Sequence, residues 1–293
     1  MRTRWFVLLA LVALVAAACS SGGTTTTKSE SGGDAAATTT TENEEMESHE
    51  PTVFVDAPVA SITVDGDPSD WATIDGLDIE LEPIEEEVGK GPENRDATVK
   101  FAHDDENIYA LVTVDDDYNF DPNNAHFSAA VAVMFNIDGA PHMGADDDAG
   151  ENSVGMVDIW HWELDCASGE QSGGAVNPAG DGSDPGNDSV CNLDDEWATD
   201  SDNREDDNTA TGENSLLGVW SHSNPVEDGE GQWYFELSRP LQTGDEQDAQ
   251  FTVGDTAELA IAYWDPDFSP EGWDGDHHVQ SAELGWIGVN LQG

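Results

Sequence analysis

The sequence predicts an all-β fold built as an antiparallel β-sandwich. From Val53 onward, short runs of β-branched and aromatic residues are separated by Asp, Gly, Asn and Pro, which is the pattern of strands joined by turns. No comparable segment has a helical pattern. Several short strands with turn signals between them are typical of a sandwich or barrel. The chain has 293 residues, which is long enough to bury a core.

Nine segments carry the strand pattern. They are rich in Val, Ile, Phe, Tyr and Trp, the residues that favour strands. The expected strands are residues 61–65, 77–84, 97–104, 107–116, 129–138, 156–164, 232–241, 257–265 and 284–291.

The N-terminus has the layout of a secretory signal. Residues 1–18 combine two arginines with an apolar run of about a dozen residues and then small residues, and this run is too short for a confident membrane span. The ending "AAAC" resembles a bacterial lipobox, which implies cleavage before Cys19 and lipid on its thiol; the alternative is an ordinary signal peptide followed by a chance cysteine. Residues 19–52 are rich in Ser, Thr and Gly, and we expect a disordered linker. The chain is therefore predicted to be an exported lipoprotein, anchored in the cell membrane only by its lipid and facing the extracytoplasmic side.

Export places the remaining cysteines in an oxidising compartment. Cys166 and Cys191 can pair there, and we predict a disulfide that closes a polar loop. A metal site is the weaker alternative because no partner pair of cysteines is present. Residues 166–217 as a whole interrupt the strand rhythm, so they are expected to form a long loop insertion in a folded domain of residues 53–293.

The net charge of the chain excludes polyanionic partners. Eight Lys and Arg residues stand against 63 Asp and Glu, and the net charge of −55 repels DNA, RNA and anionic lipid. The carboxylates recur along the whole chain, which favours a solvated acidic surface suited to a saline environment over calcium storage. The segment "DGDPSD" does not complete an EF-hand, because its loop lacks the glycine at position six and the glutamate at position twelve.

The segment "GMVDIWHWELDC" (residues 155–166) places a histidine between two tryptophans. In a strand, Trp160 and Trp162 share one face while His161 lies on the other. We expect the tryptophans to pack in the sandwich or against a cofactor. Of the other histidines, His142 could cap a pocket, and His103, His126 and His222 lie next to turns and are expected to be solvated.

Catalytic motifs are missing from the sequence. No Ser/His/Asp order stands out and no Gly-rich phosphate loop follows a strand. Carboxylates are too abundant for any two to be singled out as a glycosidase pair. We predict that the chain has no catalytic site of its own.

Six blocks, in this order, carry a family resemblance: "VDGDPSDW", "ATVKFAHDDENIYALVTVDD", "DIWHWE", "LDDEW", "FELSRPLQTGDEQDAQF" and "LAIAYWD". Their order and spacing resemble the haem b-binding domain of ethylbenzene dehydrogenase γ-subunits and related DMSO reductase-family enzymes, over nearly all of residues 53–293. The block "DGDPSDW" alone would equally fit family 9 carbohydrate-binding modules. Both groups are β-sandwiches, so the resemblance implies the same fold either way.

The resemblance implies a noncovalent haem b with methionine and lysine as axial ligands, serving electron transfer beside a molybdenum enzyme. The family methionine matches Met143 in "PHMGADD". No lysine follows Lys100, and the position aligned with the family lysine holds His278, with His277 as its neighbour. Adjacent residues of an extended segment face opposite ways, so at most one of the two histidines can point into a pocket. A Met/His pair is a known way to hold an electron-transfer haem.

His161 matches no ligand position of the family. The family tends to have lysine after "WHW", where this chain has Glu163. We therefore expect His161 to hydrogen-bond to a haem propionate or a neighbouring loop, and rank it below His278 as a ligand. Covalent c-type attachment is excluded because there is no C-x-x-C-H motif.

Two functions remain open. The first is a surface-anchored haem b protein that exchanges electrons with an exported molybdenum enzyme or another redox protein. The alternative is a noncatalytic module that binds carbohydrate on exposed tryptophans. The candidate tryptophans are Trp160, Trp220, Trp233, Trp264, Trp273 and Trp286.

Overall fold

A computed structural model describes residues 50–83, 93–138, 155–164, 167–169, 171–173, 193–199, 204–207, 214–270, 272–273, 278–281 and 284–293. All of them belong to one compact unit, Glu47–Gly293. In these ranges there is no helix of the length and apolar character needed to cross a membrane.

The described residues fold into strands and short 3-10 turns, which confirms the predicted all-β class. The strands are β1 (Val53–Ala57), β2 (Leu77–Pro83), β3 (Arg95–His103), β4 (Asn107–Tyr118), β5 (Ala130–Asn136), β6 (Val157–Glu163), β7 (Ser172–Gly173), β8 (Leu193–Ala198), β9 (Arg204–Asp206), β10 (Leu217–His222), β11 (Gly229–Pro240), β12 (Thr256–Trp264), β13 (Val279–Gln280) and β14 (Ile287–Leu291). The 3-10 turns are η1 (Pro68–Thr73), η3 (Ala125–Phe127) and η4 (Pro266–Phe268).

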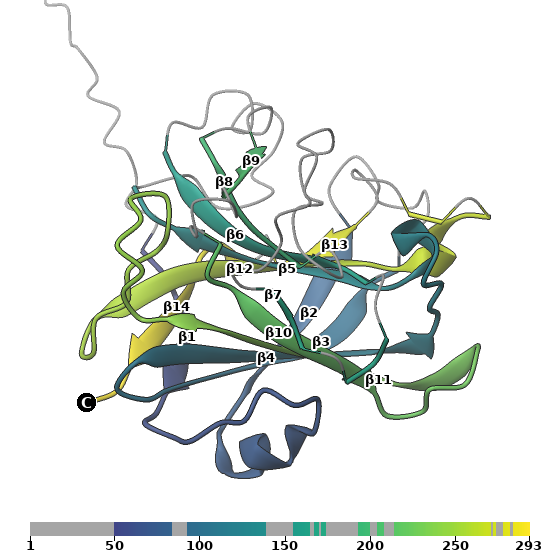
Figure 1. The fold of residues 1–293 in the computed structure, drawn as a ribbon, viewed down its shortest axis with the longest axis horizontal. Helices are drawn as coiled ribbons and strands as arrows, with labels where there is room; N and C mark the ends of the chain where they lie inside the picture. Colours follow the sequence, from purple (N-terminus) through teal and green to yellow (C-terminus); the bar gives the residue numbers. More distant parts are fainter. Residues whose placement is uncertain are drawn as a thin grey trace, which may run out of the picture. The chain divides into compact units, whose positions relative to one another are not determined.

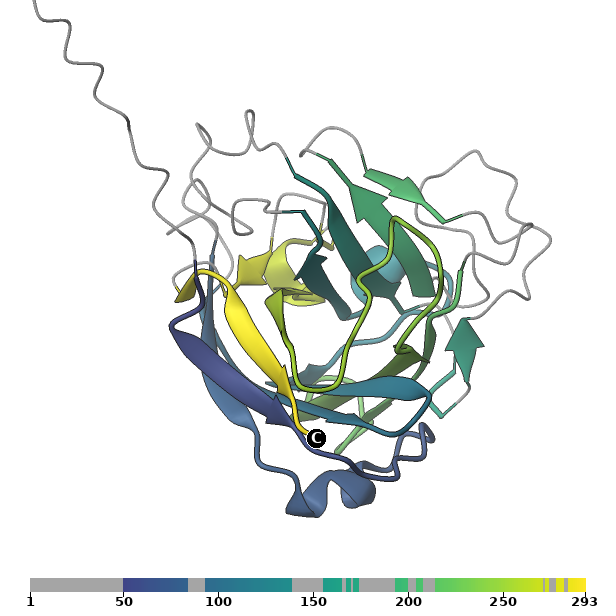
Figure 2. The ribbon, with the colours of Figure 1, turned by 90° about the vertical axis from the view of Figure 1, so that its left-hand side faces the viewer.

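The strands form two layers that are joined at one edge (Figure 1). Sheet B runs β7-β10-β11-β4-β3-β2, and sheet A runs β13-β12-β5-β6-β8-β9. The pairing of β2 with β13 connects the two sheets, so the whole is one sheet that folds over on itself. Strand β14 pairs with β12, and β1 lies parallel beside β14 (Figure 2). All other described strand pairs are antiparallel, as the sequence predicted.

A large apolar core fills the space between the sheets. Alternate residues of each strand point into it, because side chains in a strand alternate between its two faces. The largest side chains of this core include Trp160, Trp162, Trp220, Trp233 and Phe135, and all five are fully buried. Trp160 and Trp162 therefore pack in the sandwich, which is the first of the two roles predicted for them.

The "DGDPSDW" block is a loop fixed onto the outer face of sheet B. Glu236, buried on β11, accepts hydrogen bonds from the backbone N–H groups of Asp65 and Gly66 (3.0 and 2.6 Å) and from the indole N–H of Trp71 (2.8 Å). Burial raises the pKa of Glu236, while these three donors favour its charged form. Glu236 therefore holds this loop, including η1, against the sheet.

Two sequence predictions about this fold are wrong. Residues 61–65 do not form a strand; Ile62 instead packs with Trp71 and Tyr109 on the outer face of sheet B. The range 166–217 is not a plain loop insertion, because its described residues include β7, β8 and β9. Strand β8 was missed because its sequence, "LDDEWA", has three acidic residues, whereas in the fold both of its faces are buried.

Candidate functional site

The outer face of sheet A has an unusual composition. On the central strands β12, β5 and β6, the inward positions hold large apolar residues that belong to the core. The outward positions on β5 and β12 include Ala130, Ala132, Ala260 and Ala262, which we call the alanine floor. All four alanines are buried although they face away from the core. Ala130, Ala132 and Ala262 pack in one apolar cluster with Trp264 and Trp273, and Ala260 packs in another with Met134 and Trp286.

The strand register places histidines at both sides of this floor. His161 on β6 is paired with Ala132 on β5, which is paired with Ala262 on β12. Ala262 is paired in turn with Gln280 on β13, and Gln280 follows His278 by two residues. His161 and the segment of His278 thus border one row across the sheet.

Aromatic rings connect the two sides. The ring of Trp264 lies 5.2 Å from that of His161 and 4.8 Å from that of His278, measured between centroids. Trp273 lies 6.0 Å from Trp264 and stacks on His126 at 4.5 Å. We call these five residues the outer cluster.

His161 is the most deeply buried histidine of the outer cluster, at 3 % exposure. Its Nδ1 lies 3.4 Å from a carboxylate oxygen of Glu196 on β8, and its Nε2 has no hydrogen-bond partner among the described residues. The nearest described charge to Nε2 is the Glu163 carboxylate at 3.9 Å. Glu196 is fully buried and also pairs with Arg204, whose Nε lies 3.2 Å away. The hydrogen-bond partner of His161 is thus a carboxylate of the neighbouring strand rather than a loop.

The other predicted site residues are placed as follows. His278 is half-buried, and its Nε2 lies 3.4 Å from the side-chain oxygen of Gln280. Trp160 and Trp162 face the core, on the opposite side of β6 from His161. Several predictions fall outside the described residues: the ligand Met143, the alternative ligand His277, the neighbouring His142, the lipidated Cys19 and the disulfide partners Cys166 and Cys191.

Two histidines expected to be solvated are buried. His103 is buried, and its Nδ1 and Nε2 lie 3.0 and 2.8 Å from the backbone carbonyl oxygens of Asp104 and Gln292. His222 packs on the ring of Trp233 at 4.8 Å. His126 is exposed, as predicted. The turn residues that flank His103 and His222 concealed the fact that both histidines end strands of sheet B.

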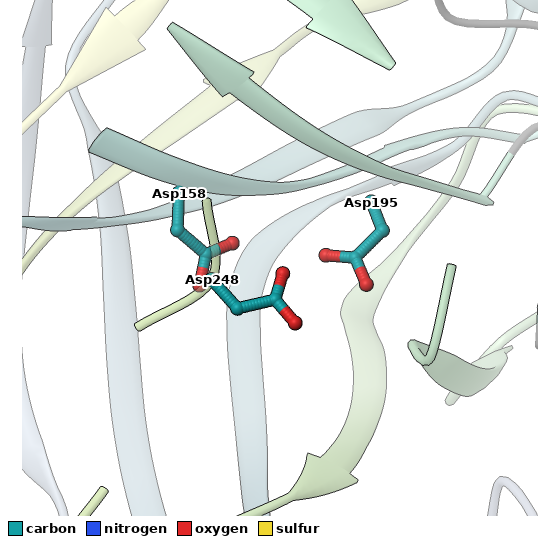
Figure 3. Close-up of side chains that lie close together, drawn as sticks. All are labelled: Asp158, Asp195 and Asp248. Carbon is teal, nitrogen blue, oxygen red and sulfur yellow. The ribbon is translucent and has the colours of Figure 1, made fainter. Parts of the chain in front are cut away.

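A second polar group lies inside the core, between the sheets. Figure 3 shows the carboxylates of Asp158, Asp195 and Asp248 converging, and they lie close enough together for a metal site. However, Arg239 from β11 already lies among them. Its guanidinium donates to Asp158, Asp195 and Asp248 at 2.5, 3.0 and 3.1 Å. The positive charge among these carboxylates thus comes from Arg239. Because Arg239 lies on β11 and its partners Asp158 and Asp195 lie on β6 and β8, the ion pairs join sheet B to sheet A.

This group has more carboxylates than positive charges. Some of the carboxylates bind a proton, which reduces the negative charge that Arg239 does not neutralise. Burial raises the pKa of Asp158 to about 7 and that of Asp248 to about 6. Burial, together with the nearby carboxylates of Asp195 and Asp248, raises the pKa of Asp207 to about 9. Asp207 therefore carries a proton at neutral pH.

The exposed tryptophans expected of a sugar-binding surface are not found. All six candidates are buried, with exposed fractions of at most 8 %. A sugar ring stacks on an aromatic face that solvent can reach, and none of these six offers such a face. The exposed large apolar residues among the described ones are Phe54, Val59, Phe127, Val226 and Val253.

Sequence comparison decides the family. The family model described as ethylbenzene dehydrogenase matches residues 68–279. The chain belongs to the ethylbenzene dehydrogenase family. The predicted resemblance is thus confirmed over the range that contains η1, the alanine floor and all five residues of the outer cluster. No curated protein matches the sequence.

The solved structures similar to this ethylbenzene dehydrogenase family member include carbohydrate-binding proteins. One is a family 9 carbohydrate-binding module from Caldicellulosiruptor kristjanssonii in complex with cellotriose, at 11 % identity and a TM-score of 0.43, covering 82 % of this chain and 93 % of the module. Another is a proposed carbohydrate-binding protein from Bacteroides uniformis, at 10 % identity and a TM-score of 0.46, covering 82 % of this chain and all of that one.

Proposed function

We propose that this chain is a noncovalent haem b protein that transfers electrons to or from an exported redox enzyme and has no catalytic site of its own. The family supports a haem-binding subunit of a redox enzyme. The observation that carries the proposal for this chain is the buried Nε2 of His161, which faces away from the core and lacks a hydrogen-bond partner among the described residues. Bound haem b would supply a one-electron iron couple.

The residues of the outer face fit such a group. Apolar surroundings for such a group would come from Trp264 and Trp273, which pack with Ala130, Ala132 and Ala262 in one cluster. Imidazole nitrogens at the border of the floor are good iron ligands, and both His161 and His278 offer one. The thioether carried over from the family is Met143. A Met/His pair would hold the iron in a low-spin state suited to electron transfer.

The chain's own residues would also keep water away from this site. The alanines, His161, Trp264 and Trp273 are each at most 8 % exposed. A low dielectric around the site limits the reorganisation that accompanies a change of charge. The surrounding carboxylates, at a net charge of −55 for the chain, favour a redox partner with a basic docking surface. A molybdenum enzyme of the kind that the family implies is the partner we propose.

Titration of the full-length, detergent-extracted chain with ferric haem tests the proposal. We expect a Soret band that saturates at about one haem per chain and shifts on reduction with dithionite. Absorbance that rises without saturation, like that of free haem, would rule out the proposed function.

Anchoring is a separate proposal. The N-terminal sequence supports cleavage before Cys19 and lipid attachment to its thiol. Mass spectrometry of the N-terminal peptide should find a diacylglyceryl cysteine, and Cys19→Ser should release the chain from the membrane fraction. A mature chain that begins at another residue would contradict the anchor without touching the haem proposal.

A further inference from the structure

We propose that an acidic cleft beside the start of β12 binds an elongated aliphatic cation of the polyamine type, in which ammonium groups are separated by methylene chains. The cleft has a volume of about 730 Å³, which lies in the range of small-molecule sites. Its walls come mainly from residues 242–252, which follow β11, from residues 255–258 and from the end of β5. No residue of the outer cluster lines the cleft, so this inference is independent of the proposed haem function.

The charged residues that line the cleft are all negative. Five carboxylates line it, and no Lys, Arg or His residue does. These carboxylates are Asp245, Glu246, Asp248, Asp255 and Glu258. Glu246 and Asp255 are exposed, so both can reach a ligand that enters from solvent. Charge complementarity therefore selects a cation.

Buried charge behind the wall of the cleft strengthens this preference. Asp248 is only 2 % exposed, and its Oδ1 pairs with Arg239 at 3.1 Å. The same guanidinium also serves Asp158 and Asp195. Oδ2 of Asp248 has no hydrogen-bond partner among the described residues. This group has more carboxylates than positive charges even with the proton that Asp207 carries, so a cation in the cleft supplies charge that the group lacks.

The spacing of the carboxylates argues against a single metal ion as the ligand. A calcium ion requires several oxygen ligands that converge on one point. Among the described residues, the carboxylates that come within 4.8 Å of one another in a group of three are Asp158, Asp195 and Asp248, and Arg239 already lies among them. The other four carboxylates of the cleft belong to no such group. Dispersed negative charges match a ligand whose positive charges are also spread along its length.

The cleft also has an apolar part, which suits the methylene segments of such a ligand. Ile137, Phe251, Ala257 and Leu291 line it together with the carboxylates. Phe251 and Leu291 are buried residues of the main core, so this part of the lining is fixed by packing. An alkyl chain gains free energy when it covers apolar surface, whereas a hydrated metal ion does not.

The loop that carries three of the carboxylates is held in place by Gln250. The Nε2 of Gln250 donates hydrogen bonds to Oγ1 of Thr243 at 2.8 Å and to the carbonyl oxygens of Asp245 and Asp248 at 2.9 and 3.1 Å. Its Oε1 accepts a hydrogen bond from the backbone N–H of Thr243 at 3.1 Å. This wall of the cleft is therefore formed before a ligand arrives, and binding costs little conformational entropy.

Isothermal titration calorimetry of the full-length, detergent-extracted chain without haem tests the inference. Spermidine is the probe, at about 0.15 M sodium chloride, which screens diffuse attraction to the acidic surface. We expect saturation at about one spermidine per chain. Neutral butanediol, which has the alkyl chain without the ammonium groups, should bind much more weakly.

Two double variants locate the site. Glu246→Gln with Asp255→Asn removes two exposed carboxylates of the cleft and should weaken spermidine binding roughly tenfold. The matched control is Asp78→Asn with Asp96→Asn, which removes the same charge from another acidic depression, on sheet B. The control should change the affinity by less than about twofold. Far-ultraviolet circular dichroism checks that both double variants fold.

Three results would overturn the inference. Spermidine heats that do not saturate near one site per chain would indicate no defined site, and equal losses in the two double variants would indicate diffuse counter-ion binding. Calcium chloride that saturates in place of spermidine, and loses its binding in Glu246→Gln with Asp255→Asn, would assign a metal site instead. None of these results bears on the haem titration, so failure of this inference and failure of the proposed function are distinguishable.

Discussion

Arg239 joins the two sheets through buried ion pairs. Its guanidinium is fully buried, donates to three carboxylates and lies 5.1 Å from the ring of Trp160. Removing one partner of a buried ion pair leaves the other charges without compensation, at a cost of about 3–5 kcal/mol. Arg239→Gln should therefore lower the free energy of unfolding by about that amount in urea denaturation.

The matched control for Arg239 is Arg204→Gln. Arg204 also pairs with a buried carboxylate, that of Glu196, but its own side chain is 41 % exposed. Water screens such a pair, so we expect a loss below about 1 kcal/mol. Equal losses in the two variants would contradict the central role of Arg239.

Asp207 makes stability depend on pH in an unusual direction. Its pKa is raised from 3.8 to about 9 in the folded protein, so the folded state holds a proton that the unfolded state has lost. This contribution is fully present below pH 3.8 and disappears as the pH rises through 9. The melting temperature should thus be higher at pH 5 than at pH 8, by roughly 3 °C or more.

Asp207→Asn separates this effect from general charge repulsion. The amide cannot titrate, so the variant should lose part of the difference in melting temperature between pH 5 and pH 8. Differential scanning calorimetry of both proteins at matched ionic strength measures the change. Identical pH profiles would show that Asp207 is ionised in the folded protein.

At the scale of the elements, η1 depends on the buried carboxylate of Glu236. This carboxylate accepts three hydrogen bonds from the "DGDPSDW" loop. In Glu236→Ala, the indole N–H of Trp71 and two backbone N–H groups lose their acceptor. An unpaired buried donor costs about 1–3 kcal/mol. We expect hydrogen exchange of residues 65–73 to accelerate strongly in this variant, with smaller changes in β5 and β6. Exchange that rises equally across both sheets would contradict a local role.

Sequence patterns predicted most central strands because one face of each is apolar. The alternation in "DIWHWE" also placed His161 opposite Trp160 and Trp162 correctly. Strand β8 escaped prediction because its acidic residues are buried on both faces: Asp195 binds Arg239 inside, and Glu196 binds His161 outside. The contact between His161 and Glu196 therefore could not be predicted, because the strand that carries Glu196 was itself not predicted.

The alanine floor could not be predicted from the sequence for a related reason. Ala132 and Ala262 are 130 positions apart in the chain, and only the pairing of β5 with β12 brings them into one row. Each alanine by itself fits any buried strand. The residue types of the site were therefore visible in the sequence, but the surface they form depends on strand register.

For the whole molecule, the net charge of −55 opposes compactness. Like charges repel more strongly in the folded state, where they are closer together, and salt screens them: the Debye length falls from about 10 Å at 0.1 M to about 3 Å at 1 M. The melting temperature should rise between 0.1 and 1 M monovalent salt. Sodium chloride and choline chloride should act alike, because screening depends on ionic strength and not on the identity of the cation. A rise with sodium alone would instead indicate specific cation binding at the carboxylates, and no rise at all would contradict repulsion as a limit on stability.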